Sequence, residues 1–219
     1  MKLYFISGLG ADHRVFDKLF LPDYEPVHLA WITPKAFESI ESYTKRLSEN
    51  ITEPEPILGL SFGGIIAIEI AKHITVKKII LISSVRSGSQ LNLMYKLAGA
   101  MKITSKIPVK SLITVTPLTF LLFGIKIKAE KDLLQKIIED SDLAFYGWAV
   151  NALTTWKHIE STTKMIHIHG DRDHVLRMPR GVDHVIKGGG HFMVYNRASE
   201  ISALIQLELQ KTITVKEQN

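Results

Sequence analysis

Cysteine is absent from the 219 residues of this chain. Its absence excludes disulfide bonds, thiolate ligands for metals and a cysteine nucleophile. It also fits a reducing compartment, so we expect a cytoplasmic location. With 46% hydrophobic and 22% charged residues, the chain has the composition of an ordinary globular protein and is long enough to bury its own core.

Long hydrophobic runs are missing as well. The apolar run near the N-terminus covers only residues 3–6, which is too short for the hydrophobic region of a signal peptide. The longest uncharged stretch covers residues 111–125 and is interrupted by Pro117. It falls short of the roughly 18 to 20 apolar residues that a spanning helix needs, so we expect no transmembrane segment.

Acidic residues are lacking in one part of the chain. Residues 86–128 contain seven lysines and arginines and no Asp or Glu, although the net charge of the whole chain is only +5. The aromatic and motif signals of a nucleic-acid binder do not accompany these charges, so we expect no nucleic-acid partner. We interpret them as lysines on the solvent-exposed faces of amphipathic helices; attraction of an anionic substrate or weak contact with a membrane surface are alternatives.

Short apolar runs bounded by glycine or polar turns alternate with segments of helical periodicity. This alternation predicts an α/β fold, a mostly parallel sheet of about six strands with helices on both faces. We predict strands at residues 3–7, 26–31, 56–60, 78–83, 164–169 and 183–187. We predict helices near residues 39–50, 62–73 and 198–211.

The interval between the fourth and fifth predicted strands is too long for a single crossover. It contains several helical patterns, and we interpret residues 85–161 as a helical cap inserted into a core formed by residues 1–84 and 162–219. Trp148 and Trp156 belong to an aromatic stripe of helical spacing in this insertion. Such a stripe packs into a core or lines a ligand pocket, and the two tryptophans are candidate pocket residues.

A Gly-x-Ser-x-Gly pattern, Gly59-Leu-Ser61-Phe-Gly63, lies between a predicted strand and an apolar helix. A serine at such a sharp turn takes a strained backbone conformation, and side chains at positions 59 and 63 would collide with the turn. The turn points the Ser61 hydroxyl and the first N–H groups of the helix at the same space. Ser61 is therefore a candidate nucleophile.

The stretch His167-Ile-His169-Gly-Asp171-Arg-Asp173-His174 combines possible metal ligands and acids. His167 and His169 would share one face of a strand, as a pair of zinc ligands does. The spacing does not match the His-x-His-x-Asp-His pattern of metallo-β-lactamase-like hydrolases. We therefore favour two hydrogen-bonded interior histidines and predict no metal site.

The glycine-flanked serine, the later acidic stretch and the final Gly-Gly-Gly-His191-Phe segment resemble the α/β-hydrolase family in type and order. In that family the acid follows the glycine of the His-Gly step by three residues, which implies that Asp173 is the acid and His191 the base. The resemblance also implies an oxyanion hole made by the backbone N–H groups of Leu9 and Phe62.

As a function, the resemblance implies a serine hydrolase that cleaves a carboxylic ester, thioester or lactone without a cofactor. The apolar insertion favours a small-molecule substrate with a hydrophobic group. Hydroxynitrile lyases and cofactor-free perhydrolases use the same three residues on this fold, and a non-catalytic ligand-binding member is a further alternative. The sequence leaves the natural substrate and the oligomeric state open.

Overall fold

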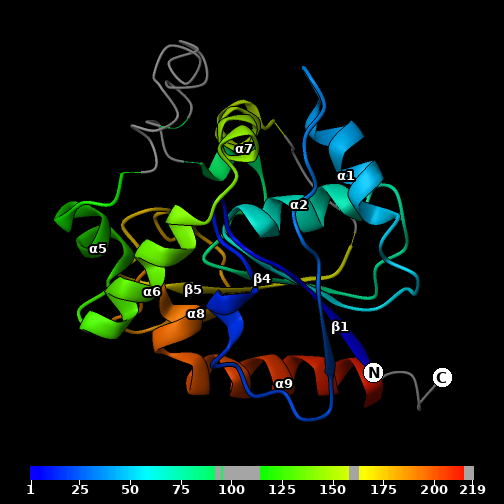
Figure 1. The fold of residues 1–219 in the computed structure, drawn as a ribbon. Coiled ribbons are helices and arrows are strands. Elements are labelled where there is room, and N and C mark those ends of the chain that lie inside the picture. The colour runs from blue at the N-terminus through cyan, green and yellow to red at the C-terminus, as the bar shows by residue number, and fades with distance from the viewer. Residues whose placement is uncertain (92–94, 96–113, 158–162, 215–219) are drawn as a thin grey trace.

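A single six-stranded sheet forms the centre of the computed structural model, which describes residues 1–91, 95, 114–157 and 163–214 (Figure 1). The strand order is β2-β1-β3-β4-β5-β6, and every neighbouring pair is parallel. The strands are β1 (Lys2–Ile6), β2 (Glu25–His28), β3 (Ile57–Leu60), β4 (Ile79–Ile82), β5 (Met165–Gly170) and β6 (His184–Ile186). The predicted fold class, a parallel sheet of about six strands, is confirmed.

The strand order reverses between β1 and β3. From β1 the chain first runs to the edge strand β2 and then returns to the other side of β1 as β3. Open α/β sheets bind ligands at such a reversal, beyond the carboxyl ends of the strands. Here the loop after β1 and the turn after β3, which holds Ser61, meet at that place.

Helices cover both faces of the sheet, because successive strand residues are buried on opposite sides (Figure 1). One apolar layer includes Ile57 and Leu81 with side chains of α1 (Ile40–Ser48), α2 (Phe62–Ile70) and α7 (Leu143–Thr155). The other includes Leu58 and Ile80 with side chains of α8 (Met193–Asn196) and α9 (Ala198–Thr214). Helices α1, α2 and α9 correspond to the three that the sequence predicts.

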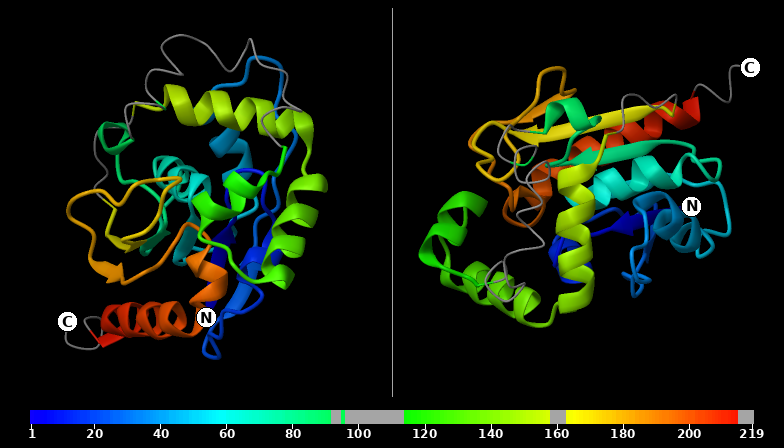
Figure 2. Two further views of the ribbon diagram at one scale, coloured as in Figure 1. Left: turned by 90° about the vertical axis from the view of Figure 1, so that its left-hand side faces the viewer. Right: turned by 90° about the horizontal axis from the view of Figure 1, so that it is seen from above.

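The chain between β4 and β5 contains the 3-10 turn η2 (Gly88–Gln90) and the helices α5 (Pro117–Phe123), α6 (Lys128–Glu139) and α7. Figure 2 shows α7 on the side of the molecule opposite α9, with α5 and α6 following one another beside the sheet. The exact division of the chain at residues 85 and 161 stays a prediction. Four residues of the basic stretch lie outside the described residues: Lys96, Lys102, Lys106 and Lys110.

Candidate active site

Ser61 occupies the sharp turn between β3 and α2. Its backbone has φ 52° and ψ −119°, a conformation that non-glycine residues rarely adopt and that costs on the order of 1–3 kcal/mol. Hydrogen bonds hold both sides of the residue: Ser61 N donates to the Ile82 carbonyl at 2.9 Å, and the Ser61 carbonyl accepts from Gly64 N at 3.0 Å and from Ser84 Oγ at 2.7 Å. These contacts stabilise the strained residue through its backbone alone and do not involve its hydroxyl.

The glycines on either side of Ser61 are required by close backbone approaches. A Cβ at Gly59 would lie 2.5 Å from the Gly63 carbonyl oxygen, and a Cβ at Gly63 would lie 2.2 Å from the Ile6 carbonyl oxygen. Real Cβ atoms do not come so close to backbone. The two glycines thus allow α2 to begin directly against the ends of β1 and β3.

The structure brings Ser61, His191 and Asp173 into one chain of hydrogen bonds. His191 Nε2 lies 3.0 Å from Ser61 Oγ, and His191 Nδ1 lies 2.7 Å from Asp173 Oδ2. A carboxylate accepts hydrogen bonds, so Nδ1 carries the proton and Nε2 is the acceptor for the serine hydroxyl. Both His191 and Asp173 are buried.

Asp173 is held as a carboxylate by its own loop. Its Oδ1 accepts from Val175 N and Leu176 N, each at 2.9 Å. Burial raises the pKa of Asp173, but the charge of His191 and hydrogen bonds from His169 and His191 outweigh it, and the pKa is well below its ordinary value. Asp173 therefore stays negatively charged at neutral pH.

Asp171 has a different position. It is exposed, and its Oδ1 accepts from Gly188 N at 2.6 Å, which ties two loops together. No hydrogen bond joins it to His191 within the described part of the chain. Asp171 therefore acts as a backbone acceptor between the two loops.

The His191 loop is fixed by a contact that the sequence does not indicate. Phe192 N donates to the Phe123 carbonyl at 3.0 Å, and the Phe123 ring packs edge-on against the His191 imidazole with 5.2 Å between centroids. A Cβ at Gly190 would lie 2.8 Å from the Phe123 carbonyl oxygen. Phe123 ends α5, 68 positions before His191, and no local sequence pattern marks the pairing.

The loop after β1 lies against Ser61, since a Cβ at Gly8 would be 3.5 Å from the Ser61 Cβ. Of the two predicted oxyanion donors, Leu9 belongs to this loop, and Phe62 is the first residue of α2 and follows Ser61 directly. Neither backbone N–H has a hydrogen-bond partner among the described residues. Their role as donors to a bound oxygen atom stays a prediction.

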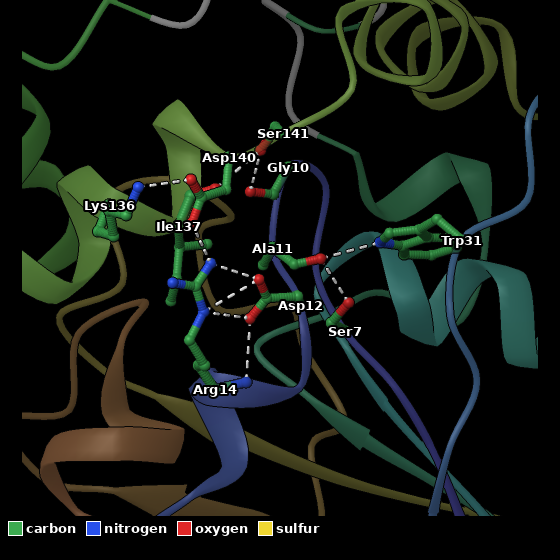
Figure 3. A network of polar contacts seen from close by, with 10 residues as sticks. All are labelled: Ser7, Gly10, Ala11, Asp12, Arg14, Trp31, Lys136, Ile137, Asp140 and Ser141. Atoms are coloured by element: carbon green, nitrogen blue, oxygen red, sulfur yellow. Dashed lines mark hydrogen bonds and ion pairs between the residues drawn. The ribbon is translucent and has the colours of Figure 1, made fainter.

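Hydrogen bonds fix this loop from both sides (Figure 3). The Ala11 carbonyl accepts from Ser7 Oγ at 2.7 Å and from Trp31 Nε1 at 3.0 Å. On the other side, Ser141 Oγ donates to the Gly10 carbonyl at 2.7 Å. The Ser7 hydroxyl thus supplies a closing bond within the loop.

An ion-pair network continues from the loop to the insertion (Figure 3). Arg14 binds Asp12 at 2.6 Å and Asp140 at 2.9 Å, and Asp140 also pairs with Lys136 at 2.7 Å. Asp140 and Ser141 form the corner between α6 and α7. The corner of the insertion is therefore bonded to the loop that presents Leu9.

A cavity of about 600 Å³ opens onto Ser61 and His191. Its far walls come from the insertion and are mainly apolar: Leu122 and Phe123 of α5, Leu134 and Ile138 of α6, and Val150 and Leu153 of α7. Gly8, Leu9 and Gly10 form the wall beside Ser61. The arrangement places an apolar space directly beyond a hydrogen-bonded serine.

Trp148 and Trp156 do not line this cavity, which corrects the prediction that they are pocket residues. Trp148 stacks on Tyr43 of α1 and donates to the Glu38 carbonyl at 2.8 Å. Trp156 is 6% exposed and donates to Glu69 Oε1 at 2.8 Å. Trp148 thus joins α7 to the turn before α1, and Trp156, directly after α7, is joined to α2.

His167 and His169 are fully buried and contact each other, with His167 Nε2 3.0 Å from His169 Nδ1. In the described ranges, no group of three or more His, Asp or Glu residues is arranged to hold a metal ion.

Within the described part of the chain, no helix has the length and apolar character needed to cross a membrane.

Comparisons with known proteins find solved structures of the same architecture. No protein-family model and no curated protein matches the chain. An esterase from Exiguobacterium antarcticum matches with a TM-score of 0.70 at 13% identity, over 96% of this chain and 92% of that one. MenH from S. aureus matches with a TM-score of 0.70 at 15% identity, over 97% and 94%.

A bromoperoxidase from Bacillus anthracis matches with a TM-score of 0.66 at 14% identity, over 95% of this chain and 91% of that one. The three proteins carry different activity names, so the likeness concerns the backbone and not a particular substrate. It extends over nearly the whole length of each chain. The protein therefore has the α/β-hydrolase fold.

Proposed function

We propose that the protein is a serine hydrolase that cleaves a carboxylic ester, thioester or lactone carrying a hydrophobic group. The observation that carries the proposal is the Ser61–His191–Asp173 hydrogen-bond chain at the mouth of an apolar cavity. Esterases among the structures of this fold support a hydrolytic reaction. The proposed chemistry uses side chains and backbone only and needs no cofactor.

In the acylation step, Ser61 Oγ attacks the carbonyl carbon and His191 Nε2 takes the hydroxyl proton. Asp173 stabilises the imidazolium and keeps its Nδ1–H in place. The oxygen of the tetrahedral intermediate accepts from Leu9 N–H and Phe62 N–H, and losing one such donor typically costs about 10²- to 10³-fold in rate. His191 then gives its proton to the departing alcohol or thiol.

In the deacylation step, His191 Nε2 takes a proton from water, and the resulting hydroxide attacks the acyl-serine. Collapse of the second tetrahedral intermediate returns the proton to Ser61 and releases the acid. The hydrophobic group occupies the space between α5, α6 and α7, which we propose to form a cap over the site. Only the ester-like head of the substrate then meets polar groups.

The test is hydrolysis of p-nitrophenyl esters of increasing chain length by the purified protein and by Ser61→Ala. We expect turnover by the wild type, a drop to the rate of the uncatalysed background in Ser61→Ala, and covalent labelling of Ser61 by a fluorophosphonate. Absence of both turnover and labelling would contradict the proposal and favour a ligand-binding role. Ser61-dependent cleavage of cyanohydrins or perhydrolysis without ester hydrolysis would favour the lyase or perhydrolase alternative.

A further inference from the structure

The two histidines of β5 lie directly behind the proposed acid. Both side chains have no exposed surface, and they point to the same face of the sheet because they are two residues apart on a strand. His169 Nε2 lies 3.4 Å from Asp173 Oδ2, the same oxygen that accepts from His191. The reaction proposed above assigns no task to either histidine.

His169 makes its short hydrogen bond to the backbone of the Asp173 loop. Its Nε2 lies 2.8 Å from the Leu176 carbonyl oxygen. A carbonyl oxygen only accepts, so Nε2 carries the proton and donates it. The N–H of the same residue, Leu176, donates to Asp173 Oδ1 at 2.9 Å. The backbone of Leu176 therefore links the two side chains: its carbonyl accepts from His169, and its N–H donates to the Asp173 carboxylate.

His167 fixes which nitrogen of His169 is the donor. Burial, followed by the neighbouring His169 and Arg86, lowers the pKa of His167 to about 3, so His167 is neutral at physiological pH. In a neutral pair, His169 Nδ1 is an acceptor and His167 Nε2–H is its donor at 3.0 Å. The Ser84 backbone opposes this lowering of the pKa, although no hydrogen bond of ordinary geometry to His167 Nδ1 occurs among the described residues.

Resting on the proposed function, we propose that His169 is a positioning residue for the triad. Its Nε2–H holds the Leu176 carbonyl and thereby the backbone N–H groups that turn the Asp173 carboxylate toward His191, while His167 fixes the tautomer of His169 that does so. The hydrogen-bond chain of the site thus extends inward from Ser61 to His167 through four further groups: His191, Asp173, Leu176 and His169.

The experiment compares three variants with the wild type. His169→Phe keeps a ring of similar size and removes the donor, whereas His169→Gln keeps an N–H able to reach a carbonyl. His184→Phe is the matched control, because His184 is a hydrogen-bonded histidine on the neighbouring strand β6 and contacts Glu208 instead of the triad. Thermal unfolding of each variant identifies those that remain folded.

Two readouts report on positioning. The first is kcat and KM with the best p-nitrophenyl ester. The second is the far-downfield proton NMR signal of His191 Nδ1–H in its hydrogen bond to Asp173, which needs no substrate. We expect His169→Phe to lower kcat by about 10- to 100-fold, the factor associated with one lost buried hydrogen bond. We expect KM to change less than about twofold and the downfield signal to broaden or shift. His169→Gln should restore most of kcat and of the downfield signal, and His184→Phe should keep kcat and the signal of the wild type.

Two results would overturn the proposal. In the first, folded His169→Phe keeps kcat and the downfield signal of the wild type, so that His169 only fills the core. In the second, all three variants lose activity in proportion to their loss of stability. Failure of the proposed function is distinct: the wild type would then show no Ser61-dependent turnover, and the NMR comparison would still decide whether His169 positions Asp173.

Discussion

Two aspartates two residues apart have opposite surroundings. Asp173 is buried, accepts from two backbone N–H groups and meets His191 at 2.7 Å, whereas Asp171 is exposed and binds only the backbone of Gly188 among the described residues. Each aspartate can serve as a control for the other, because replacing Asp by Asn is nearly isosteric at both positions.

We predict that Asp173→Asn lowers Ser61-dependent turnover by around 10⁴-fold. An amide at this position stabilises the wrong tautomer of His191 and cannot balance the imidazolium charge, while the geometry stays intact. The rate constant for p-nitrophenyl ester hydrolysis measures the loss.

The matched variant is Asp171→Asn, which keeps an oxygen acceptor for Gly188 N. It should keep kcat within a few-fold and change the free energy of unfolding by about 1 kcal/mol or less. The reverse pattern, with activity lost in Asp171→Asn and kept in Asp173→Asn, would identify Asp171 as the acid.

Among the elements, the corner between α6 and α7 acts on the loop after β1. Ser141 Oγ reaches the Gly10 carbonyl, and the Gly10 backbone adopts φ +68° with the Tyr146 ring where a side chain would be. Gly10 follows Leu9 directly, so this corner contacts the residue next to the predicted oxyanion donor.

We predict that Ser141→Ala lowers kcat by about tenfold with little change in KM. The lost hydrogen bond lets the loop relax, and a donor that meets the oxyanion mainly in the transition state affects kcat more than ground-state binding. Steady-state kinetics with one ester separate the two constants.

Ser48→Ala is a suitable control for that variant. Ser48 Oγ also donates to a backbone carbonyl, that of Lys45 at 2.7 Å, but within α1 and away from the cavity. Equal kcat values for the two variants would show that the α6–α7 corner does not act on the loop after β1.

Local patterns predict the elements well and the contacts between them poorly. Apolar runs and turn residues predict all six strands and three helices, because strand burial and helix periodicity leave a local signature. The Ser141–Gly10 bond joins residues 131 positions apart, and the Phe123–Phe192 bond joins the end of α5 to the residue before α8 with no shared pattern. The Trp148 and Trp156 placement fails for a related reason: an aromatic stripe looks the same whether it faces a cavity or a core.

At the scale of the whole molecule, the cavity is lined by residues that follow β1 and β3 and by residues of α5, α6 and α7. The order of Ser61, Asp173 and His191 and the glycines around them predict the hydrogen-bonded group when they are combined with the resemblance to the α/β-hydrolase family. Cavity size and lining depend on how α5, α6 and α7 pack, which no short pattern records. Substrate preference should therefore respond to changes in the insertion.

We predict that Val150→Phe shifts the preference toward shorter acyl chains. Val150 lines the cavity from α7, and a larger ring there removes room for the distal part of a long chain. The ratio of kcat/KM for long to short p-nitrophenyl esters should fall about tenfold or more. Asn151→Phe, the same new side chain at the adjacent exposed position, should leave the ratio unchanged. An equal ratio in both variants would contradict a role of this cavity in binding the acyl chain.

The close backbone approach between Gly124 and Gly190 has a consequence for protein engineering. The end of α5 supplies the Phe123 carbonyl to Phe192 and the Phe123 ring to His191, so part of the support for His191 comes from the segment between β4 and β5. This segment is thus not independent of the His191 loop. A segment transplanted from another protein would have to bring an equivalent Phe-Gly pair to keep the position of His191.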